Sequence, residues 1–203
     1  MLSQLRPAVT LIALFTLLTG GILPTLFVGF GYLAFPFQAG GSLVERNGKV
    51  VGSAIIGQNF TAAKYFHGRP SALMGTDPRD SSKQVATPYD ASESGASNLA
   101  PTSRALLDRV RDDVGHYGAL AVPADAVTTS ASGLDPDISP ENAYRQAPRI
   151  ATARSLAVET VNGLIASHTV ERLGGVLGAP RVNVLLLNLA LDARRRTYLP
   201  TMP

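Results

Sequence analysis

The stretch PAVTLIALFTLLTGGILPTLFVGFGYLAFPF, from Pro7 to Phe37, runs for 31 residues without one charged side chain. About 20 apolar residues of helix cross the roughly 30 Å hydrocarbon layer of a bilayer, so the stretch predicts a membrane-spanning helix. A cleaved secretory signal is the alternative, but its apolar region is usually only ~7 to 15 residues long, and no clean small-x-small site follows. We therefore expect an uncleaved membrane anchor over residues 1–38 and one domain over residues 39–203.

The charges that flank the span indicate its direction. Arg6 and the amino terminus precede it, whereas Glu45, Arg46 and Lys49 follow at some distance. Because basic residues favour the cytoplasmic side of a span, this weak bias predicts a cytoplasmic N-terminus. The domain over residues 39–203 would then be extracytoplasmic, on the outer side of the cell (plasma) membrane.

Small residues recur on one face of the predicted span. Gly21, Thr25 and Gly29 are spaced by four, and such a face lets two helix backbones approach closely within lipid. We interpret it as a docking face for another membrane helix, although Gly and Thr are also simply frequent in membrane helices. Pro24 removes the backbone donor that would pair with the Gly20 carbonyl, so a kink is expected there.

The chain beyond the span is nearly neutral. Of the 18 basic residues only Arg6 precedes the span, which leaves seventeen basic against 15 acidic residues, too balanced for a nucleic-acid surface. There is no cysteine, hence neither a disulfide framework nor a thiolate site. The one dense basic run, Arg194 to Arg196, suits either membrane lipid headgroups or a solvated tail.

The extracytoplasmic part combines strands, helices and much loop. Asn47-Gly48 is a strong hairpin signal, because both central residues of a type I′ turn need positive φ. Ser139 as N-cap and Pro140 at the first helical position mark a helix start, and Pro148 should kink or split that helix. In chain order we expect strands at 43–46 and 49–56, a long loop over 58–101, a helix from 102, a strand at 127–130, helices from 140 and around 158–168, and a buried strand over 182–191. The predicted fold is α+β, with a single N-terminal transmembrane helix followed by one loop-rich domain.

Motifs for catalysis are missing from the sequence. Gly48-Lys49 is followed by Val50 and lacks the upstream glycine of a phosphate-binding loop, and neither Gly-x-Ser-x-Gly nor His-Glu-x-x-His occurs. The three histidines share no metal-ligand spacing, and the carboxylates Asp135 and Asp137 suit turn hydrogen bonding and capping better than a metal. A Ser-His-Asp triad stays open, because its members meet only in space. We expect no catalytic residue, no metal and no cofactor of the chain's own.

The assembled pattern resembles the KdpC family of the Kdp potassium-transporting ATPases of prokaryotes, over nearly the whole chain. After the span, the blocks that carry the resemblance are Gly57-Gln58-Asn59-Phe60, Tyr65-Phe66-His67-Gly68-Arg69-Pro70-Ser71, Ser97-Asn98-Leu99, Ser132-Gly133-Leu134-Asp135-Pro136-Asp137-Ile138, Gln146 with Arg149, Val182-Asn183-Val184, and Leu187-Asn188-Leu189-Ala190-Leu191-Asp192. Ala96 and Ala100 depart from it, since the family often has glycine there.

This resemblance implies a small accessory subunit that neither hydrolyses ATP nor conducts ions by itself. Its partners would be a channel-like potassium-translocating subunit, on which the span docks, and a P-type ATP-hydrolysing subunit. ATP and potassium would thus be handled by the complex.

The family is also described as a catalytic chaperone that raises the ATP affinity of the pump, through a glutamine proposed to contact nucleotide. Gln146 matches that position best. The predicted topology opposes the contact, because an extracytoplasmic residue cannot meet cytoplasmic ATP. From the residues alone we expect Gln146 to be a hydrogen-bonding residue on the helix surface or in the core.

Two further functions remain compatible with the residues. One is a membrane-anchored extracytoplasmic enzyme or binding protein, which would need a concave pocket with convergent titratable groups. The other is an anchored structural module with an unrelated partner.

Overall fold

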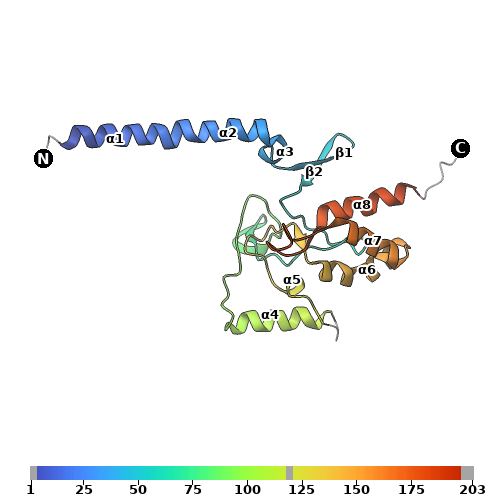
Figure 1. The fold of residues 1–203 in the computed structure, drawn as a ribbon. Coiled ribbons are helices and arrows are strands. Elements are labelled where there is room, and N and C mark those ends of the chain that lie inside the picture. The colour runs from blue at the N-terminus through green and yellow to red at the C-terminus, as the bar shows by residue number, and fades with distance from the viewer. Residues whose placement is uncertain (1–3, 118–120, 198–203) are drawn as a thin grey trace. The chain divides into compact units, whose positions relative to one another are not determined.

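The apolar N-terminal stretch forms one continuous helix in the computed structural model, which describes residues 4–117 and 121–197. The helix consists of α1 (Leu5–Leu17), the π-helical turn η2 (Leu18–Ile22) and α2 (Leu23–Ala34) (Figure 1). Its 30 residues are long and apolar enough to cross a membrane, and no other helix in the described ranges is. The length and composition of this helix therefore agree with the predicted single N-terminal span.

A kink is predicted at Pro24, and the structure shows the wide turn η2 directly before it, within a continuous helix. The backbone N–H of Leu23 donates to the carbonyl of Leu18, five residues earlier, in place of the usual four. Such a π turn absorbs the missing backbone donor of a proline without ending the helix. The hydroxyl of Thr25 also donates back to the Gly21 carbonyl at 2.8 Å.

A short helix and a hairpin follow the span. Helix α3 (Pro36–Ala39) leads to strands β1 (Leu43–Arg46) and β2 (Lys49–Ser53), which pair antiparallel. Asn47 and Gly48 have φ values of 54° and 72°, as the predicted type I′ turn requires. β2 ends at Ser53, three residues before the predicted end.

The chain divides into two compact units, residues 1–53 and 54–203. The hairpin β1–β2 belongs to the first unit together with the membrane helix. The predicted boundary after residue 38 separates membrane from extracytoplasmic residues, and it stays a prediction.

Three helices and a small sheet enclose the core of the second unit. The helices are α6 (Pro140–Arg154), α7 (Val158–His168) and α8 (Val184–Thr197) (Figure 1). Helix α7 contacts both α6 and α8, and all three helices contact β7. The antiparallel sheet has the order β5 (Asp137–Ile138), β7 (Arg181–Asn183), β6 (Thr169–Val170). The fully buried large side chains come mainly from these elements: Phe66, Ile150, Ile165, Leu187, Leu191, Val161, Val182, Asn142 and Asn188.

Helix α6 begins and continues as its residues dictate. The Ser139 hydroxyl accepts a hydrogen bond from the backbone N–H of Asn142, which confirms the predicted N-cap. Pro148 does not split the helix, which runs on to Arg154. Tyr144, whose carbonyl loses its usual partner at Pro148, lies on the exposed side.

The predicted strand over 182–191 is wrong for most of its length. Only Arg181–Asn183 is a strand, and α8 begins at Val184. Asn183 causes the change, because its side-chain oxygen accepts the backbone N–H of Leu186 at 3.1 Å and so caps the helix. A short apolar run does not by itself distinguish a buried strand from a buried helix.

The predicted strand at 127–130 is also wrong. Residues Ala124–Val127 form the short helix α5, and the hydroxyl of Thr128 donates back to the Ala124 carbonyl at 2.6 Å. The carbonyls of Thr128 and Thr129 face Arg69 rather than a neighbouring strand.

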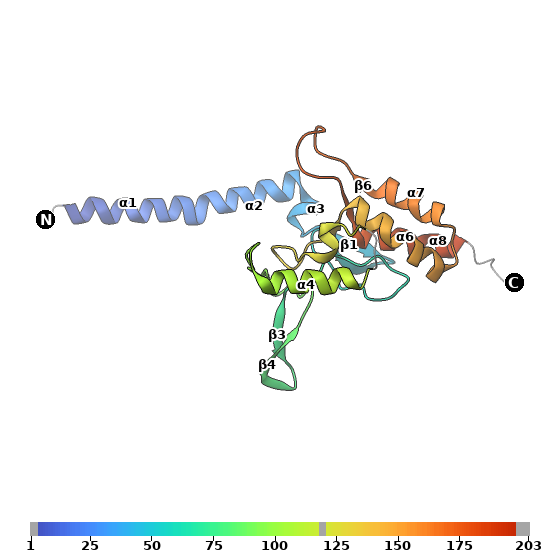
Figure 2. The same ribbon diagram turned by 90° about the horizontal axis from the view of Figure 1, so that it is seen from below.

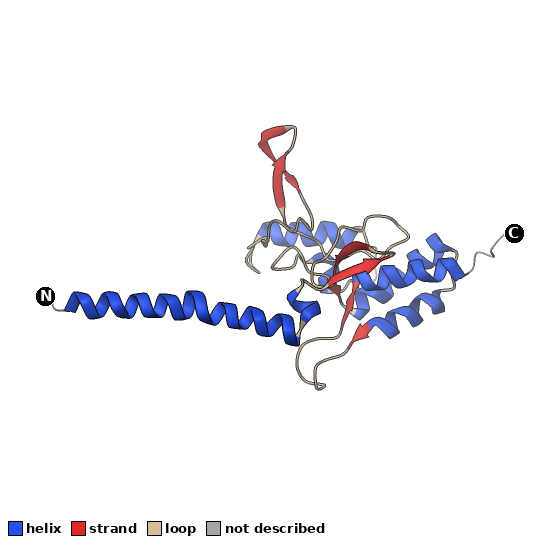
Figure 3. Cartoon of the chain, turned by 90° about the horizontal axis from the view of Figure 1, so that it is seen from above, coloured by secondary structure: helices blue, strands red, loops and turns tan. Residues whose placement is uncertain are grey.

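The predicted long loop over 58–101 contains a hairpin that the pattern did not indicate. Strands β3 (Met74–Asp77) and β4 (Asp80–Ala86) pair antiparallel and project from the second unit (Figure 2). Their residues are mostly exposed, so no alternation of apolar and polar residues marks them. Helix α4 (Arg104–Gly115) follows as expected, and Figure 3 shows how much of this unit is loop.

Close packing against Gly57 yields a stability test. A Cβ at Gly57 would lie 2.4 Å from the Tyr89 ring and 2.6 Å from the backbone oxygen of Asp135. Gly57→Ala should therefore lower the free energy of unfolding by about 1–3 kcal/mol through overpacking. Urea unfolding of the full chain in mild detergent, followed by near-ultraviolet circular dichroism, measures the change.

Gly95→Ala is the matched control, because its Cβ would meet only Leu73, at an ordinary 3.6 Å. Equal stability of the two variants would contradict the close approach at Gly57.

Candidate functional site

Residues 57–73 lie in the second unit without forming a helix or a strand. Phe66, at their centre, is fully buried in the core beside α6, α7 and α8. A buried backbone without strand neighbours must find other hydrogen-bond partners, since an unpaired N–H or C=O is costly. Side chains from α6 and α8 supply them.

Two primary amide groups each pair with one residue of this segment, the buried Phe66 or the half-buried His67. Asn188 on α8 accepts the backbone N–H of Phe66 at 2.8 Å and donates to its carbonyl at 3.0 Å. Gln146 on α6 accepts the backbone N–H of His67 at 2.8 Å and donates to its carbonyl at 3.1 Å. We call Asn188 and Gln146 the amide pair; it offers the segment the contacts that a neighbouring strand would offer.

The hydrogen-bonding capacity of Gln146 is used entirely within the domain. Besides the two bonds to His67, its Nε2 donates to Asn142 at 3.1 Å and its Oε1 accepts from Arg149 at 2.8 Å. A primary amide has two donors and one acceptor oxygen with two lone pairs, so all four positions are filled. This agrees with the residue-based expectation of a hydrogen-bonding core residue, while nucleotide contact by Gln146 stays a prediction.

Two arginines of α6 bind the carbonyls that precede Phe66. Arg149 donates to the carbonyl of Ala63 and, at 3.0 Å, to that of Tyr65. Arg154 donates to the Lys64 carbonyl at 2.6 Å, and its side chain is only 6% exposed. Arginine suits this role because its planar fork presents several fixed donors.

Asp192 completes this group from α8. Its carboxylate lies 2.8 Å from the guanidinium of Arg154 and accepts the hydroxyl proton of Tyr65 at 3.1 Å. Burial, followed by this hydrogen bond, raises the pKa of Tyr65. α6, α8 and the loop segment are thereby joined by charge as well as by the amide pair.

The segment after His67 is held by a second group of contacts. Arg69 forms an ion pair with Asp135 at 3.0 Å, and the Tyr89 hydroxyl donates to the Arg69 carbonyl at 2.6 Å. Burial and the charge of Asp135 raise the pKa of Tyr89 to about 12. Asp135 also accepts the backbone N–H of Asp137 at 3.1 Å, so the predicted turn role of Asp135 is confirmed.

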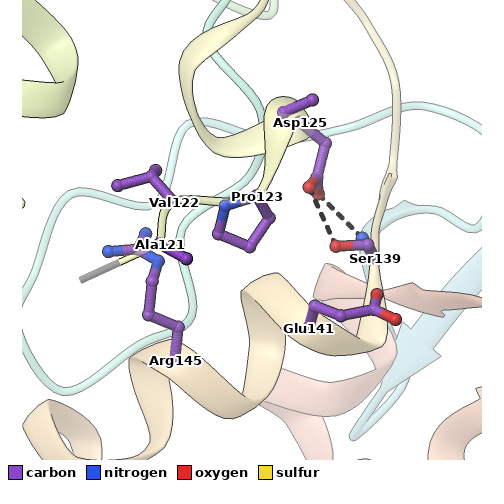
Figure 4. A pocket seen from close by; sticks show the side chains of 8 residues that line it. Ala121, Val122, Pro123, Asp125, Ser139, Glu141 and Arg145 are labelled. Carbon is purple, nitrogen blue, oxygen red and sulfur yellow. Dashed lines mark hydrogen bonds between the residues drawn. The ribbon is translucent and has the colours of Figure 1, made fainter.

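Asp125 fixes the start of α6 (Figure 4). Its carboxylate accepts the backbone N–H and the hydroxyl of Ser139, both at 2.8 Å, and the Asn142 amide at 3.1 Å. These bonds orient the first turn of the helix that carries Gln146 and Arg149.

A cationic pocket of about 360 Å³ lies beside Gln146. It is lined by His67, Gly68, His116, Tyr117, Ala126, Asn142, Arg145, Gln146 and Arg149, none of which is acidic. The Arg145 guanidinium stacks on the Tyr117 ring at 3.9 Å. Burial and neighbouring Arg145 lower the pKa of Arg149, and burial and Arg149 lower the pKa of His67.

The predicted docking residues lie on the membrane helix of the first unit. A Cβ built at Gly29 would meet no atom within 4 Å, and one at Gly21 would meet only a Leu17 methyl, at 3.7 Å. The bond from Thr25 to the Gly21 carbonyl places these two residues one turn apart. This small-residue face is open along the helix, as a docking helix would need.

The structure brings some sequence candidates together and not others. Gln146 and His67 meet directly, whereas Arg194 lies exposed on α8, and the side chains of Arg195 and Arg196 fall outside those described. Within the described ranges, no three His, Asp or Glu side chains gather closely enough to hold a metal ion. Sequence reasoning missed the role of Asn188, although an amide inside the apolar run 182–191 was a usable signal.

Comparison with known proteins identifies related chains. The family described as "KdpC: K+-transporting ATPase, c chain" matches residues 5–193. A potassium-transporting ATPase KdpC subunit of Rhodopseudomonas palustris (strain BisB18) is 56% identical over 199 residues, covering 96% of this chain and 100% of that one. The protein of the same name from Bradyrhizobium diazoefficiens is 56% identical over 196 residues, covering 95% and 98%. The protein of that name from Methylobacterium nodulans is 55% identical over 196 residues, covering 95% of this chain and 98% of that one.

Removing one member of the amide pair should destabilise the second unit. Asn188→Leu keeps a similar volume but leaves the buried N–H and C=O of Phe66 unpaired, at about 1–3 kcal/mol for each group. We expect a loss of about 2–5 kcal/mol in the free energy of unfolding by urea denaturation in detergent. Asn59→Leu, the same change at an exposed position, should have little effect. A similar small loss at both positions would refute the pairing.

The lowered pKa of His67 predicts a pH dependence. Unfolded His67 binds a proton near its usual pKa of 6.5, and folded His67 only at lower pH, so stability falls as pH drops below about 6.5. The difference in unfolding free energy between about pH 7.5 and about pH 5 should shrink in His67→Gln. His116→Gln, at an exposed histidine, should leave it in place. An unchanged difference in His67→Gln would argue against the burial effect.

Proposed function

Because the chain belongs to the KdpC family, the c chains of K+-transporting ATPases, we propose that it is a non-catalytic accessory subunit of an ATP-driven potassium uptake complex. Its partners in this proposal are a channel-like potassium-translocating subunit and a P-type ATP-hydrolysing subunit. The chain holds the complex together and acts as a catalytic chaperone that raises the ATP affinity of the pump. ATP and potassium are bound by the partners.

The membrane helix is the feature that supports this role most directly. Its small-residue face, Gly21, Thr25 and Gly29, carries no side chain large enough to keep another helix away. Helices in lipid gain little from hydrophobicity alone and associate through close packing of such faces. The proposed occupant of the face is a helix of the channel-like subunit.

The second unit suits a role in assembly. The amide pair and the arginines of α6 hold residues 57–73 in place through hydrogen bonds. Exposed features such as the hairpin β3–β4 are then presented on a fixed base. We propose that the unit is extracytoplasmic, following the charge bias around the span.

Any effect of this subunit on ATP affinity would be indirect under this topology. Gln146 has no hydrogen-bonding position left for a nucleotide while it holds His67. Coupling to the pump would then pass through a two-state element of the complex that both sites bias. The cationic pocket is the one observation that favours the alternative, an anchored binding protein for an anionic ligand.

The test is gentle detergent purification of the tagged chain from its native membrane, with mass spectrometry and a potassium-stimulated ATPase assay. Gly21→Leu with Gly29→Leu should reduce recovery of the partners and of the activity by about tenfold or more, equivalent to about 1.4 kcal/mol of docking energy. A complex purified without the chain should show a raised KM for ATP.

Gly20→Leu is the matched control, because Gly20 is equally open but, as the residue before Gly21 in η2, lies on a different side of the helix. Equal recovery from both variants would mean that the span is only an anchor. A chain that purifies alone, with anion binding retained after removal of the span, would favour the anchored binding protein.

A further inference from the structure

The loop between β6 and β7 carries an exposed apolar tip. Three of its side chains are largely exposed: Leu173 at 76%, Val176 at 77% and Leu177 at 66%. We call residues 173–177 the apolar tip. Figure 2 shows the loop extending away from β6. Aliphatic side chains gathered at such a projection are unusual for a surface that faces only water.

The backbone of the tip closes on itself. Leu173 and Leu177 exchange two hydrogen bonds, N–H of Leu173 to the Leu177 carbonyl at 2.9 Å and the reverse at 3.1 Å. Gly175 donates to the Arg172 carbonyl at 3.0 Å and Val176 to that of Leu173 at 3.3 Å. A segment can enter an apolar medium only when such groups are satisfied internally, and four N–H groups of this tip are.

Glycines hold the tip in this closed form. Gly174, Gly175 and Gly178 have φ values of 61°, 76° and 84°, a region that other residues adopt with strain. The turn is therefore a defined structure that presents Leu173, Val176 and Leu177 outward.

The tip itself carries no charge. Residues 173–180 contain no charged side chain. The charges on either side are balanced, because Glu171 precedes Arg172 and Arg181 pairs with Asp137 at 3.1 Å. An uncharged apolar segment between polar flanks suits the interface of a membrane.

The chain itself ties the second unit to the membrane through a short connection. Only residues 35–53 separate the end of α2 from the second unit, and the hairpin β1–β2 folds much of this length back on itself. The short connection keeps the local concentration of lipid around the second unit high. We propose that the apolar tip inserts into the membrane interface, as a second attachment of the chain to the membrane in addition to its helix.

Lipid fits this tip better than a protein partner does. The side chains offer only hydrocarbon, and most backbone donors of the tip are already used, so a partner would find little to recognise by hydrogen bonds. A lipid interface requires only apolar area and satisfied backbone. This second attachment goes beyond the proposed function, because it would hold for the chain alone.

The chain contains no cysteine, so a single fluorescent label reports one position. Val176→Cys carries an environment-sensitive nitrobenzoxadiazole label on the full chain, reconstituted in phosphatidylethanolamine and phosphatidylglycerol vesicles with brominated lipid. The control label is at Lys83→Cys, on the other projecting hairpin, where the side chain is 70% exposed. Insertion of about 5–10 Å should give at least about twofold stronger quenching at position 176, most by bromines near the headgroup end of the acyl chain.

Equal, weak quenching at both positions would overturn the proposal. In the purified complex, a label that reports an apolar environment but is not quenched by brominated lipid would assign the tip to a protein partner. That result would also overturn the proposal. Neither result bears on co-purification of the partners, so the proposed function is tested separately.

A second variant separates insertion from mere proximity. With the label at Ala179→Cys, the triple change Leu173→Ser, Val176→Ser and Leu177→Ser should abolish most of the quenching, because all three changes are at exposed side chains and keep the glycine turn. Undiminished quenching in the triple variant would show that the apolar side chains do not insert.

Discussion

The pairing of the Phe66 and His67 backbones with the side chains of Asn188 and Gln146 is the contact on which the second unit depends. The N–H and C=O of Phe66 are buried and would cost about 1–3 kcal/mol each if unpaired, a large part of the 5–15 kcal/mol stability of a typical domain. Because the two amides come from α6 and α8, the loop adopts its path only when these helices are packed together. The cap of α6 by Ser139, which Asp125 holds in place, and the cap of α8 by Asn183 therefore also decide the position of the loop.

The same arrangement explains how a domain with little sheet keeps long loops ordered. Arg149 and Arg154 bind carbonyls of residues 63–65, and the ion pair of Arg69 with Asp135 fixes the chain further on. These side chains provide the hydrogen bonds that a neighbouring strand provides in a sheet. Gln146 thereby acts as a positioning residue for His67.

The two units differ in the surfaces they present. The membrane helix has an open small-residue face, and association of helices within lipid depends on close packing of such faces. The apolar tip of the second unit presents aliphatic side chains on a closed turn, and the interface of a bilayer can accept such side chains without hydrogen bonds.

Features that depend on neighbours along the chain could be predicted from the sequence. The uncharged run from Pro7 to Phe37, the Asn47-Gly48 turn and the Ser139 cap were each predicted correctly, because burial in lipid, backbone φ and capping are local requirements. The packed fold was needed to show that residues 184–191 are helical, that residues 74–86 contain a hairpin and that Asn188 contacts Phe66. An apolar run fits a buried strand or a buried helix equally well, an exposed hairpin leaves no hydrophobic period, and residues 122 positions apart meet only after the helices have packed.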